Sequence, residues 1–184
     1  MIFFDLKYSQ FILLFPPMNN SKVIYLKDYT VPAFLVDTIF LDFDLYDTET
    51  IVKSRVVYYR NPQSQGPNIL ELNAESLELL NIALDGKILT ENEYTLTPER
   101  LTIENPPERF TLEIETRIHP ETNTSLEGLY VSGGKYATQC EAQGFRRMTY
   151  YPDRPDVMAK FMTRITADTS KYPVLLSNGN LIDS

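Results

Sequence analysis

Residues 110–118, Phe-Thr-Leu-Glu-Ile-Glu-Thr-Arg-Ile, decide the fold class of this chain. Apolar side chains alternate there with polar or charged ones, namely Phe110, Leu112, Ile114 and Ile118 against Thr111, Glu113, Glu115 and Arg117. A period of two is typical of a strand in an antiparallel sheet with one buried face. We therefore predict a half-buried β-strand over these residues, and it is the clearest strand in the chain.

Two earlier segments repeat the alternation around a polar turn. Apolar residues recur with a period of two between Ile39 and Leu45 and again between Val52 and Tyr58. The polar residues Asp47-Thr48-Glu49 lie between the two segments. This pattern predicts a β-hairpin with one buried face.

Two dipeptides predict further hairpin turns. Leu80, Ile82 and Leu84 lead into Asp85-Gly86, which readily takes the positive backbone angles of a tight turn. Near the end of the chain, residues 174–176 (Val-Leu-Leu) precede a second such dipeptide, Asn178-Gly179. Few residues follow it, so we expect the domain to stop within this hairpin, as a domain cut before its continuation would.

No segment shows a sustained helical stripe. Asp153 is placed to cap one short helical turn, with Val157, Met158 and Phe161 folding back on the sheet. Clusters of Asn, Gly and Pro separate the other segments at spacings that suit stacked sheets. The sequence therefore predicts one all-β domain, either an antiparallel β-sandwich or several packed antiparallel sheets.

Composition agrees with one folded domain and excludes some partners. The chain has 184 residues and is 43% hydrophobic, which is enough to bury a sizeable core. Its 25 acidic and 17 basic residues give a net charge of -8, which opposes binding to nucleic acid or to an anionic membrane. The one cysteine, Cys140, cannot form an internal disulfide, as expected of a protein in the reducing cytoplasm.

Residues 1–17 differ from the rest of the chain. They are apolar but include Asp5 and Lys7, and their apolar run from Phe11 to Phe15 is far short of the ~20 residues that a membrane helix needs. They also lack the basic start and the small-residue cleavage site of a signal peptide. We expect residues 1–17 to be a non-native or disordered extension of a domain that covers residues 18–184.

The stretch that says most about function is residues 138–156, Thr-Gln-Cys-Glu-Ala-Gln-Gly-Phe-Arg-Arg-Met-Thr-Tyr-Tyr-Pro-Asp-Arg-Pro-Asp. Three further segments accompany it, at residues 123–132, 153–161 and 172–180. In their order along the chain, the four segments resemble the N-terminal domain of the aminopeptidase N family of zinc metallopeptidases, in its bacterial form. The resemblance covers about residues 24 to 182.

The resemblance implies a role for two side chains. In that family, a Thr-Gln-x-Glu loop reaches from the all-β domain into the active site of the next domain and holds the N-terminal residue of a peptide. The matching positions are Gln139 and Glu141. A carboxylate suits this task because it accepts charge-assisted hydrogen bonds from an α-ammonium group. Without the resemblance, Glu141 would be a solvated surface charge, and Gln139 could equally tie down its own loop.

The residues next to this pair are expected to have structural roles. The Cys140 side chain should point the opposite way, into the core, as a small apolar group and not as a nucleophile. Gly144 should allow the backbone to turn tightly. Arg146 and Arg147 should brace the loop through carboxylates.

The aromatic pair Tyr150 and Tyr151, followed by Pro152, is expected to pack at the face that meets the next domain. If that domain is missing, an apolar patch beside this face and the loop of residues 138–144 would favour self-association of the chain. The open sheet edge expected after Asn178-Gly179 would be a second route to it.

The catalytic chemistry of the family needs residues that this chain lacks. The family binds zinc through the two histidines of a helical H-E-x-x-H motif and uses its Glu as general base. The one histidine here, His119, precedes Pro120 and is expected to be a surface or turn residue. The resemblance therefore implies zinc in the full-length enzyme, no cofactor in this chain, and a chain that is inactive alone.

Two functions remain open at this stage. In the first, the chain is the N-terminal substrate-recognition domain of an aminopeptidase that removes single residues from peptide N-termini, and it acts with a missing catalytic domain. In the second, it is a free-standing β-sandwich interaction module without catalysis.

Overall fold

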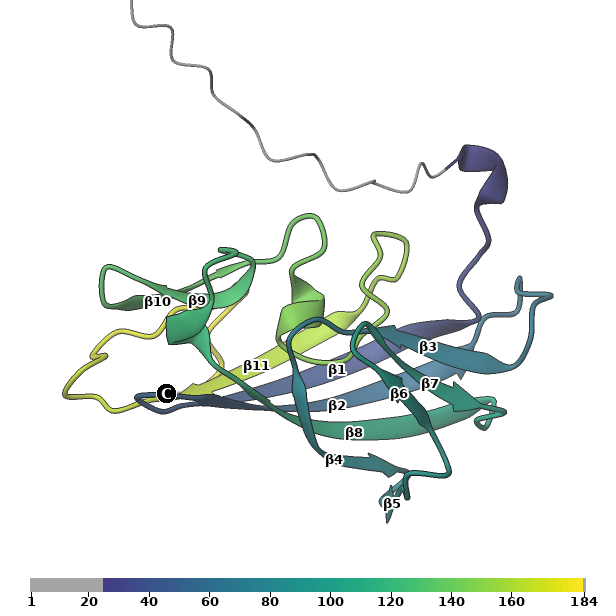
Figure 1. Cartoon of the computed structure of the whole chain (residues 1–184), viewed down its shortest axis with the longest axis horizontal. Helices are drawn as coiled ribbons and strands as arrows, with labels where there is room; N and C mark the ends of the chain where they lie inside the picture. Colours follow the sequence, from purple (N-terminus) through teal and green to yellow (C-terminus); the bar gives the residue numbers. More distant parts are fainter. Residues whose placement is uncertain (1–24, 184) are drawn as a thin grey trace, which may run out of the picture. The chain divides into compact units, whose positions relative to one another are not determined.

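The computed structural model describes residues 25–183, and most of its regular structure is β-strand (Figure 1). The strands in this range are β1 (Phe34–Leu45), β2 (Thr50–Arg60), β3 (Ile69–Asn73), β4 (Glu78–Leu84), β5 (Lys87–Ile88), β6 (Thr95–Thr97), β7 (Arg100–Glu104), β8 (Arg109–Ile118), β9 (Gly128–Ser132), β10 (Lys135–Gln139) and β11 (Lys160–Thr166). Its helical elements are three 3-10 turns, η1 (Leu26–Asp28), η2 (Pro120–Thr122) and η3 (Phe145–Arg147). The all-β prediction is confirmed, whereas the expectation for residues 1–17 lies outside the described residues.

The described residues fall into two units, residues 25–30 and residues 31–183. In the first unit the described residues form η1, where the Lys27 ammonium lies 5.3 Å from the centre of the Tyr25 ring. The eleven strands named above belong to the second unit. Within the described residues, no helix is long and apolar enough to cross a bilayer.

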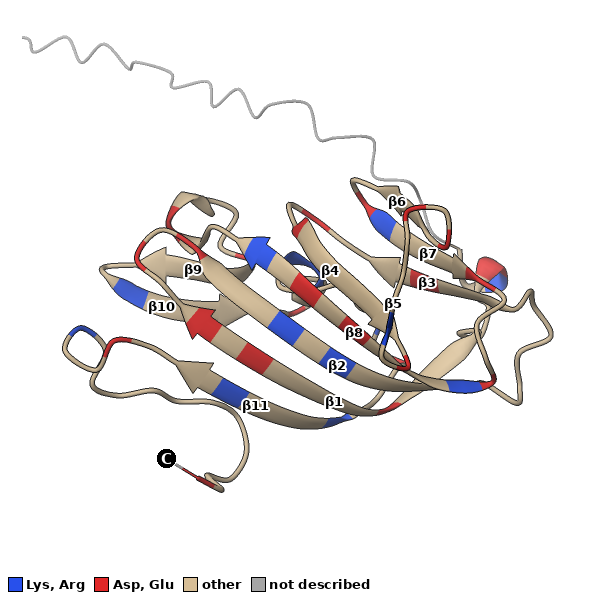
Figure 2. Cartoon of the chain, turned by 90° about the horizontal axis from the view of Figure 1, so that it is seen from below, with Lys and Arg blue, Asp and Glu red and all other residues tan. Residues whose placement is uncertain are grey.

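Six strands form the main sheet, in the order β11-β1-β2-β8-β4-β5 (Figure 2). Neighbours from β1 to β5 pair antiparallel, whereas β11 runs parallel to β1 at the edge of the sheet. The predicted hairpin is formed by β1 and β2, and the predicted strand of residues 110–118 lies in β8. Both predictions are confirmed, and the parallel strand β11 is an addition to the predicted antiparallel pattern.

The core lies on one face of this sheet, because the period of two directs the same positions inward on each strand. A three-stranded antiparallel sheet, in the order β3-β7-β6, contributes Leu70, Leu72, Leu101 and Ile103 to the same cluster. Figure 1 shows β3, β6 and β7 on the same side of the main sheet as the third sheet, the β9-β10 hairpin. The inward apolar residues from the main sheet are Phe34, Val36, Ile39, Leu41, Phe43, Val52, Val56, Tyr58, Ile82, Phe110, Leu112, Ile114 and Ile118. The fold therefore matches the second predicted form, several packed sheets.

A bulge in β4 breaks the alternation that the sequence shows there. The pairing with β8 shifts between Leu79 and Asn81, so Leu80 is 37% exposed while Ile82 is buried. The following turn forms as predicted: Asp85 and Gly86 both have positive φ, 49° and 81°, and connect β4 to β5. The two residues therefore act as the tight hairpin turn that their identities predict.

Downstream of residue 152 the structure corrects two predictions. No helix forms within residues 153–183, and Val157 is buried whereas Met158 and Phe161 are exposed. Gly179 takes a positive φ of 94°, but the described residues after Thr166 contain no strand, so the hairpin predicted around Asn178-Gly179 does not form. Strand β11 was not predicted.

Candidate functional site

The segment with the Thr-Gln-x-Glu pattern forms the end of a hairpin and the loop after it. β10 pairs antiparallel with β9, and its last residue, Gln139, lies opposite Gly128. The turn of this hairpin contains Gly133 and Gly134, both with positive φ. The loop of residues 140–144 closes through a hydrogen bond of 2.8 Å from the Gly144 amide to the Cys140 carbonyl oxygen.

Gln139 and Glu141 lie together at the solvent-exposed edge of this loop. The Gln139 side-chain amide donates a hydrogen bond of 3.0 Å to the Glu141 carbonyl oxygen, so Gln139 does tie down its loop. The peptide bond between Glu141 and Ala142 is cis. Within residues 25–183, the Glu141 carboxylate has no hydrogen-bond or ion-pair partner.

Cys140, between the two exposed residues, is half-buried and packs against the core. Burial, with a smaller effect of the Asp153 carboxylate, raises the pKa of its thiol above the ordinary value. A thiol with a raised pKa is a poor nucleophile at neutral pH. The prediction of a packing role is confirmed, although the side chain is only partly buried.

Two arginines hold the segment that follows the loop. Arg146 donates from Nε to an Asp153 carboxylate oxygen at 3.0 Å, and its backbone amide bonds the same oxygen at 3.2 Å. Arg147 pairs with Glu75, and its Nε lies 3.3 Å from a Glu127 oxygen. The predicted bracing through carboxylates is confirmed. Asp153, expected as a helix cap, serves this bracing instead.

The next residues are anchored on the inner face of the main sheet. The Thr116 hydroxyl donates to the Met148 carbonyl oxygen at 2.8 Å, and the Ser54 and Thr149 hydroxyls are bonded at 2.9 Å. The backbone of Tyr151 exchanges two hydrogen bonds with that of Asn73, at 2.8 and 3.3 Å. The loop is thus fixed at its C-terminal side by the core itself.

Tyr150, Tyr151 and Pro152 are buried within this chain. Their predicted packing role is confirmed, but they do not form an exposed face that awaits another domain. The expected self-association of the chain stays a prediction.

Tyr136 anchors the hairpin from its other side, a role that the sequence did not reveal. Its hydroxyl donates to the Tyr46 carbonyl oxygen at 2.9 Å and lies 3.1 Å from a Glu121 oxygen. Its ring packs edge-on against Tyr172 at 5.2 Å. Burial, and then the Glu121 charge, raise the pKa of Tyr136 well above its ordinary value, so its hydroxyl keeps its proton. The available signal was an aromatic residue two positions after Gly133-Gly134, a dipeptide that is typical of a turn.

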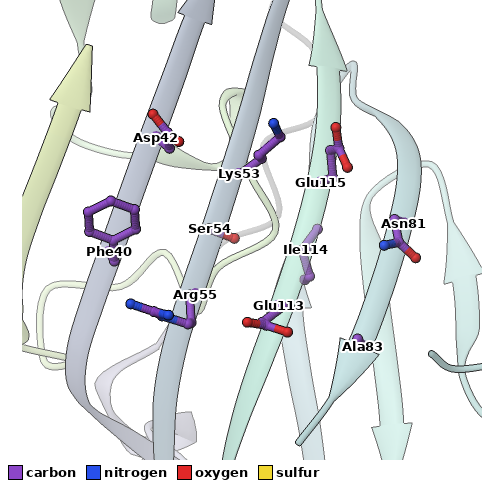
Figure 3. A pocket seen from close by; sticks show the side chains of 10 residues that line it. All are labelled: Phe40, Asp42, Lys53, Ser54, Arg55, Asn81, Ala83, Glu113, Ile114 and Glu115. Carbon is purple, nitrogen blue, oxygen red and sulfur yellow. The ribbon is translucent and has the colours of Figure 1, made fainter. Parts of the chain in front are cut away.

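The outer face of the main sheet carries a different cluster of charges (Figure 3). Asp42, Lys53 and Glu115 lie side by side across β1, β2 and β8, and Arg55 lies beside Glu113 in the next row. They line a shallow depression of about 280 Å³. Because the charges alternate in sign across neighbouring strands, we interpret this face as a sheet surface that compensates its own charge.

His119 is exposed, and its Nδ1 lies 2.9 Å from the Thr48 carbonyl oxygen, which confirms the predicted surface position. In the part of the chain that the structure describes, no three His, Cys, Asp or Glu side chains come together as a metal-binding group.

A family model of the peptidase M1 N-terminal domain matches residues 37–184. This chain belongs to that family. Among curated M1 relatives, the aminopeptidase N of Caulobacter vibrioides is 46% identical over 166 residues, and that of Escherichia coli is 46% identical over 164 residues. These matches cover 90% and 89% of this chain but 19% and 18% of the relatives, so the chain spans about a fifth of their length.

Solved structures of M1 enzymes agree with this assignment. Aminopeptidase A of Legionella pneumophila, in complex with aspartic acid, matches with a TM-score of 0.83 and 38% identity, over 89% of this chain and 19% of that one. A mutant M1 zinc metallopeptidase of Deinococcus radiodurans, bound to a Tyr-Ser-Ala substrate, has a TM-score of 0.58 and 15% identity over 72% of this chain and 32% of that one. The second likeness shows the fold alone. The resemblance inferred from the sequence is thus confirmed at the level of the M1 N-terminal domain.

Proposed function

We propose that this M1 N-terminal domain recognises the free N-terminus of a peptide for an aminopeptidase that removes single N-terminal residues. Glu141 accepts hydrogen bonds from the α-ammonium group, and Gln139 contacts the first residue of the peptide. The hydrolytic step, and the zinc that serves it, belong to the rest of the enzyme.

The observation that carries this proposal is the contrast between Glu141 and the carboxylates around it. Asp153, Glu75 and Glu127 are all paired with arginines, whereas Glu141 has no partner within residues 25–183. An exposed carboxylate on a loop that is closed by its own hydrogen bonds is ready to accept a cation without rearrangement. A peptide α-ammonium is such a cation, and it can donate up to three hydrogen bonds.

Gln139 suits the second contact. Its amide is held by the Glu141 carbonyl oxygen, which leaves the side-chain oxygen as an acceptor on the exposed side of the loop. The two residues flank Cys140, which packs against the core, and both are exposed to solvent.

The test is a chimeric enzyme, because the chain spans about a fifth of its relatives. In aminopeptidase N of C. vibrioides, the matching N-terminal segment is replaced by this chain, and kcat and KM are measured with an aminoacyl chromogenic substrate. Glu141→Gln keeps the shape of the side chain but removes its charge. Losing a hydrogen bond to a charged group costs about 1.5 to 3 kcal/mol, so KM should rise about 10-fold to 150-fold while kcat changes little.

The matched control is Glu113→Gln, the same chemical change on the opposite face of the main sheet. A second signature is the pH dependence. An α-amino group loses its proton with a pKa of about 7.7 to 8.0, so KM of the parent chimera should rise above that pH, and the rise should be smaller in Glu141→Gln. Equal KM values for the Glu141 and Glu113 variants at pH 7 would show that Glu141 does not recognise the ammonium.

A further inference from the structure

We infer that Gly144 and Gly128 are positioning residues, whose close backbone crossing sets where Gln139 and Glu141 lie. This inference rests on the proposed function, because it concerns the placement of the same two side chains. Neither glycine touches the peptide in this proposal, and both act through the loop.

The first observation is that Gly144 has no room for a side chain. A Cβ at position 144 would lie 2.3 Å from the Gln139 carbonyl oxygen, 2.8 Å from the Gly128 nitrogen and 3.0 Å from the Cys140 Cα. All three are backbone atoms, which cannot rotate away as the end of a flexible side chain can. The crossing therefore requires glycine for reasons of space.

The backbone angles of Gly144 show that glycine is required there for steric reasons and not for conformational ones. Its φ of -82° and ψ of -14° lie in the right-handed helical region, which every residue adopts easily. Gly144 therefore allows the tight turn predicted from the sequence, and it does so through the absence of its side chain and not through a special backbone angle.

Gly128 completes the crossing from the neighbouring strand. It lies opposite Gln139 in the β9-β10 ladder, and a Cβ there would lie 2.7 Å from the Arg147 Cβ and 3.0 Å from the Gly144 carbonyl oxygen. Its φ of 69° adds a conformational reason for glycine. The two glycines thus bring β9, the end of β10 and the start of η3 into direct backbone contact.

An alanine side chain at position 144 would displace backbone atoms next to Gln139 and Glu141. A methyl group at position 144 must push the Gln139 carbonyl and the Cys140 backbone away, by roughly 1 Å if ordinary van der Waals distances are to be restored. These atoms lie in the backbone between the Cα atoms of Gln139 and Glu141, so moving them moves both side chains. A displacement of about 1 Å can cost up to about 100-fold in an oriented contact, even when the substituted residue does not touch the ligand.

The experiment uses the chimeric enzyme and a cycle of variants. Gly144→Ala should raise KM about 10-fold to 100-fold with a smaller change in kcat. The same substitution is then made in a background that lacks both contacts, Gln139→Ala with Glu141→Gln, where it should change KM by less than about twofold. The control is Gly86→Ala, since a Cβ at that turn has nothing within 4 Å, and it should leave KM unchanged.

Each outcome decides one of the two proposals. If the background variant itself keeps the parent KM, the proposed function is wrong and this inference fails with it. If the background loses affinity but Gly144→Ala is harmless, or raises KM equally with and without Gln139 and Glu141, the glycine does not position them. If Gly144→Ala abolishes folding, as judged by thermal unfolding, Gly128→Ala replaces it in the same cycle. Loss of folding in both variants would overturn the inference in favour of a structural role.

Discussion

Replacing Thr149 by Val should destabilise the chain through one hydroxyl group. Thr149 is fully buried, and its Oγ1 lies 2.9 Å from the Oγ of Ser54, which is 3% exposed. Valine keeps the shape of threonine but leaves the Ser54 hydroxyl without its partner in the core. Leaving a buried polar group unsatisfied costs about 1 to 3 kcal/mol.

Thr149→Val should lower both the free energy of unfolding and the Tm. In urea unfolding of the 184-residue chain followed by circular dichroism, the free energy of unfolding should fall by about 1 to 3 kcal/mol with an unchanged m-value. For a protein of this length, each kcal/mol lowers Tm by about 2 to 4 °C, so Tm should fall by about 2 to 12 °C. The control is Thr163→Val on the exposed strand β11, which should change stability by no more than about 0.5 kcal/mol.

A second variant separates the lost hydrogen bond from the lost shape. Ser54→Ala combined with Thr149→Val removes both hydroxyls, and no buried group is then left unsatisfied at this place. The double variant should therefore be more stable than Thr149→Val alone. The reasoning is refuted if Thr149→Val matches the Thr163 control, or if the double variant loses the sum of both single losses.

The hydrogen bond between Ser54 and Thr149 also shows how much of the fold could be predicted from the sequence. The period of two in residues 110–118 and 39–58 was sufficient for β1, β2 and β8, because one face of each strand is buried and carries the apolar residues. The same period places Ser54 and Thr116 on the buried face among valines and isoleucines. A polar residue at an inward position signals a buried partner, but the sequence does not name it. Thr149 is 95 residues from Ser54.

Strand β11 could not be predicted for a related reason. Six of its seven residues are exposed, so burial imposes no period on it. Its partner β1 lies more than 100 residues earlier, and parallel pairing gives no hairpin turn to read. The Asp42 side chain shows the consequence: it belongs to the outward positions of β1 but is buried, because β11 brings Arg164 over it.

The sequence pattern located the candidate site, but it did not show that close backbone packing around Gly144 holds the site in place. Gln139 and Glu141 are exposed on one loop, as the family resemblance implies. The pattern could not distinguish a glycine required by its backbone angles from one required by lack of space, because both requirements result in the same residue. Only the position of the Gln139 carbonyl, 2.3 Å from a Cβ at residue 144, makes that distinction.

Two further predictions concern stability. Gly86→Ala should cost about 1 to 2 kcal/mol in urea unfolding, because a φ of 81° is unfavourable for alanine although the space is open. Asp42→Asn should lower stability at pH 7, by about 1 kcal/mol or less since Arg164 is largely exposed. The hydrogen bond and charge of Arg164, with the charge of Lys53, outweigh burial and hold the pKa of Asp42 below its ordinary 3.8. A carboxyl whose pKa is lower in the folded state stabilises above pH 3.8, and this contribution is lost as the pH falls through the folded pKa. The difference between parent and Asp42→Asn should therefore shrink steadily below that pH, and a difference that stays constant through the acid range would show that the ion pair does not stabilise β11 on the sheet.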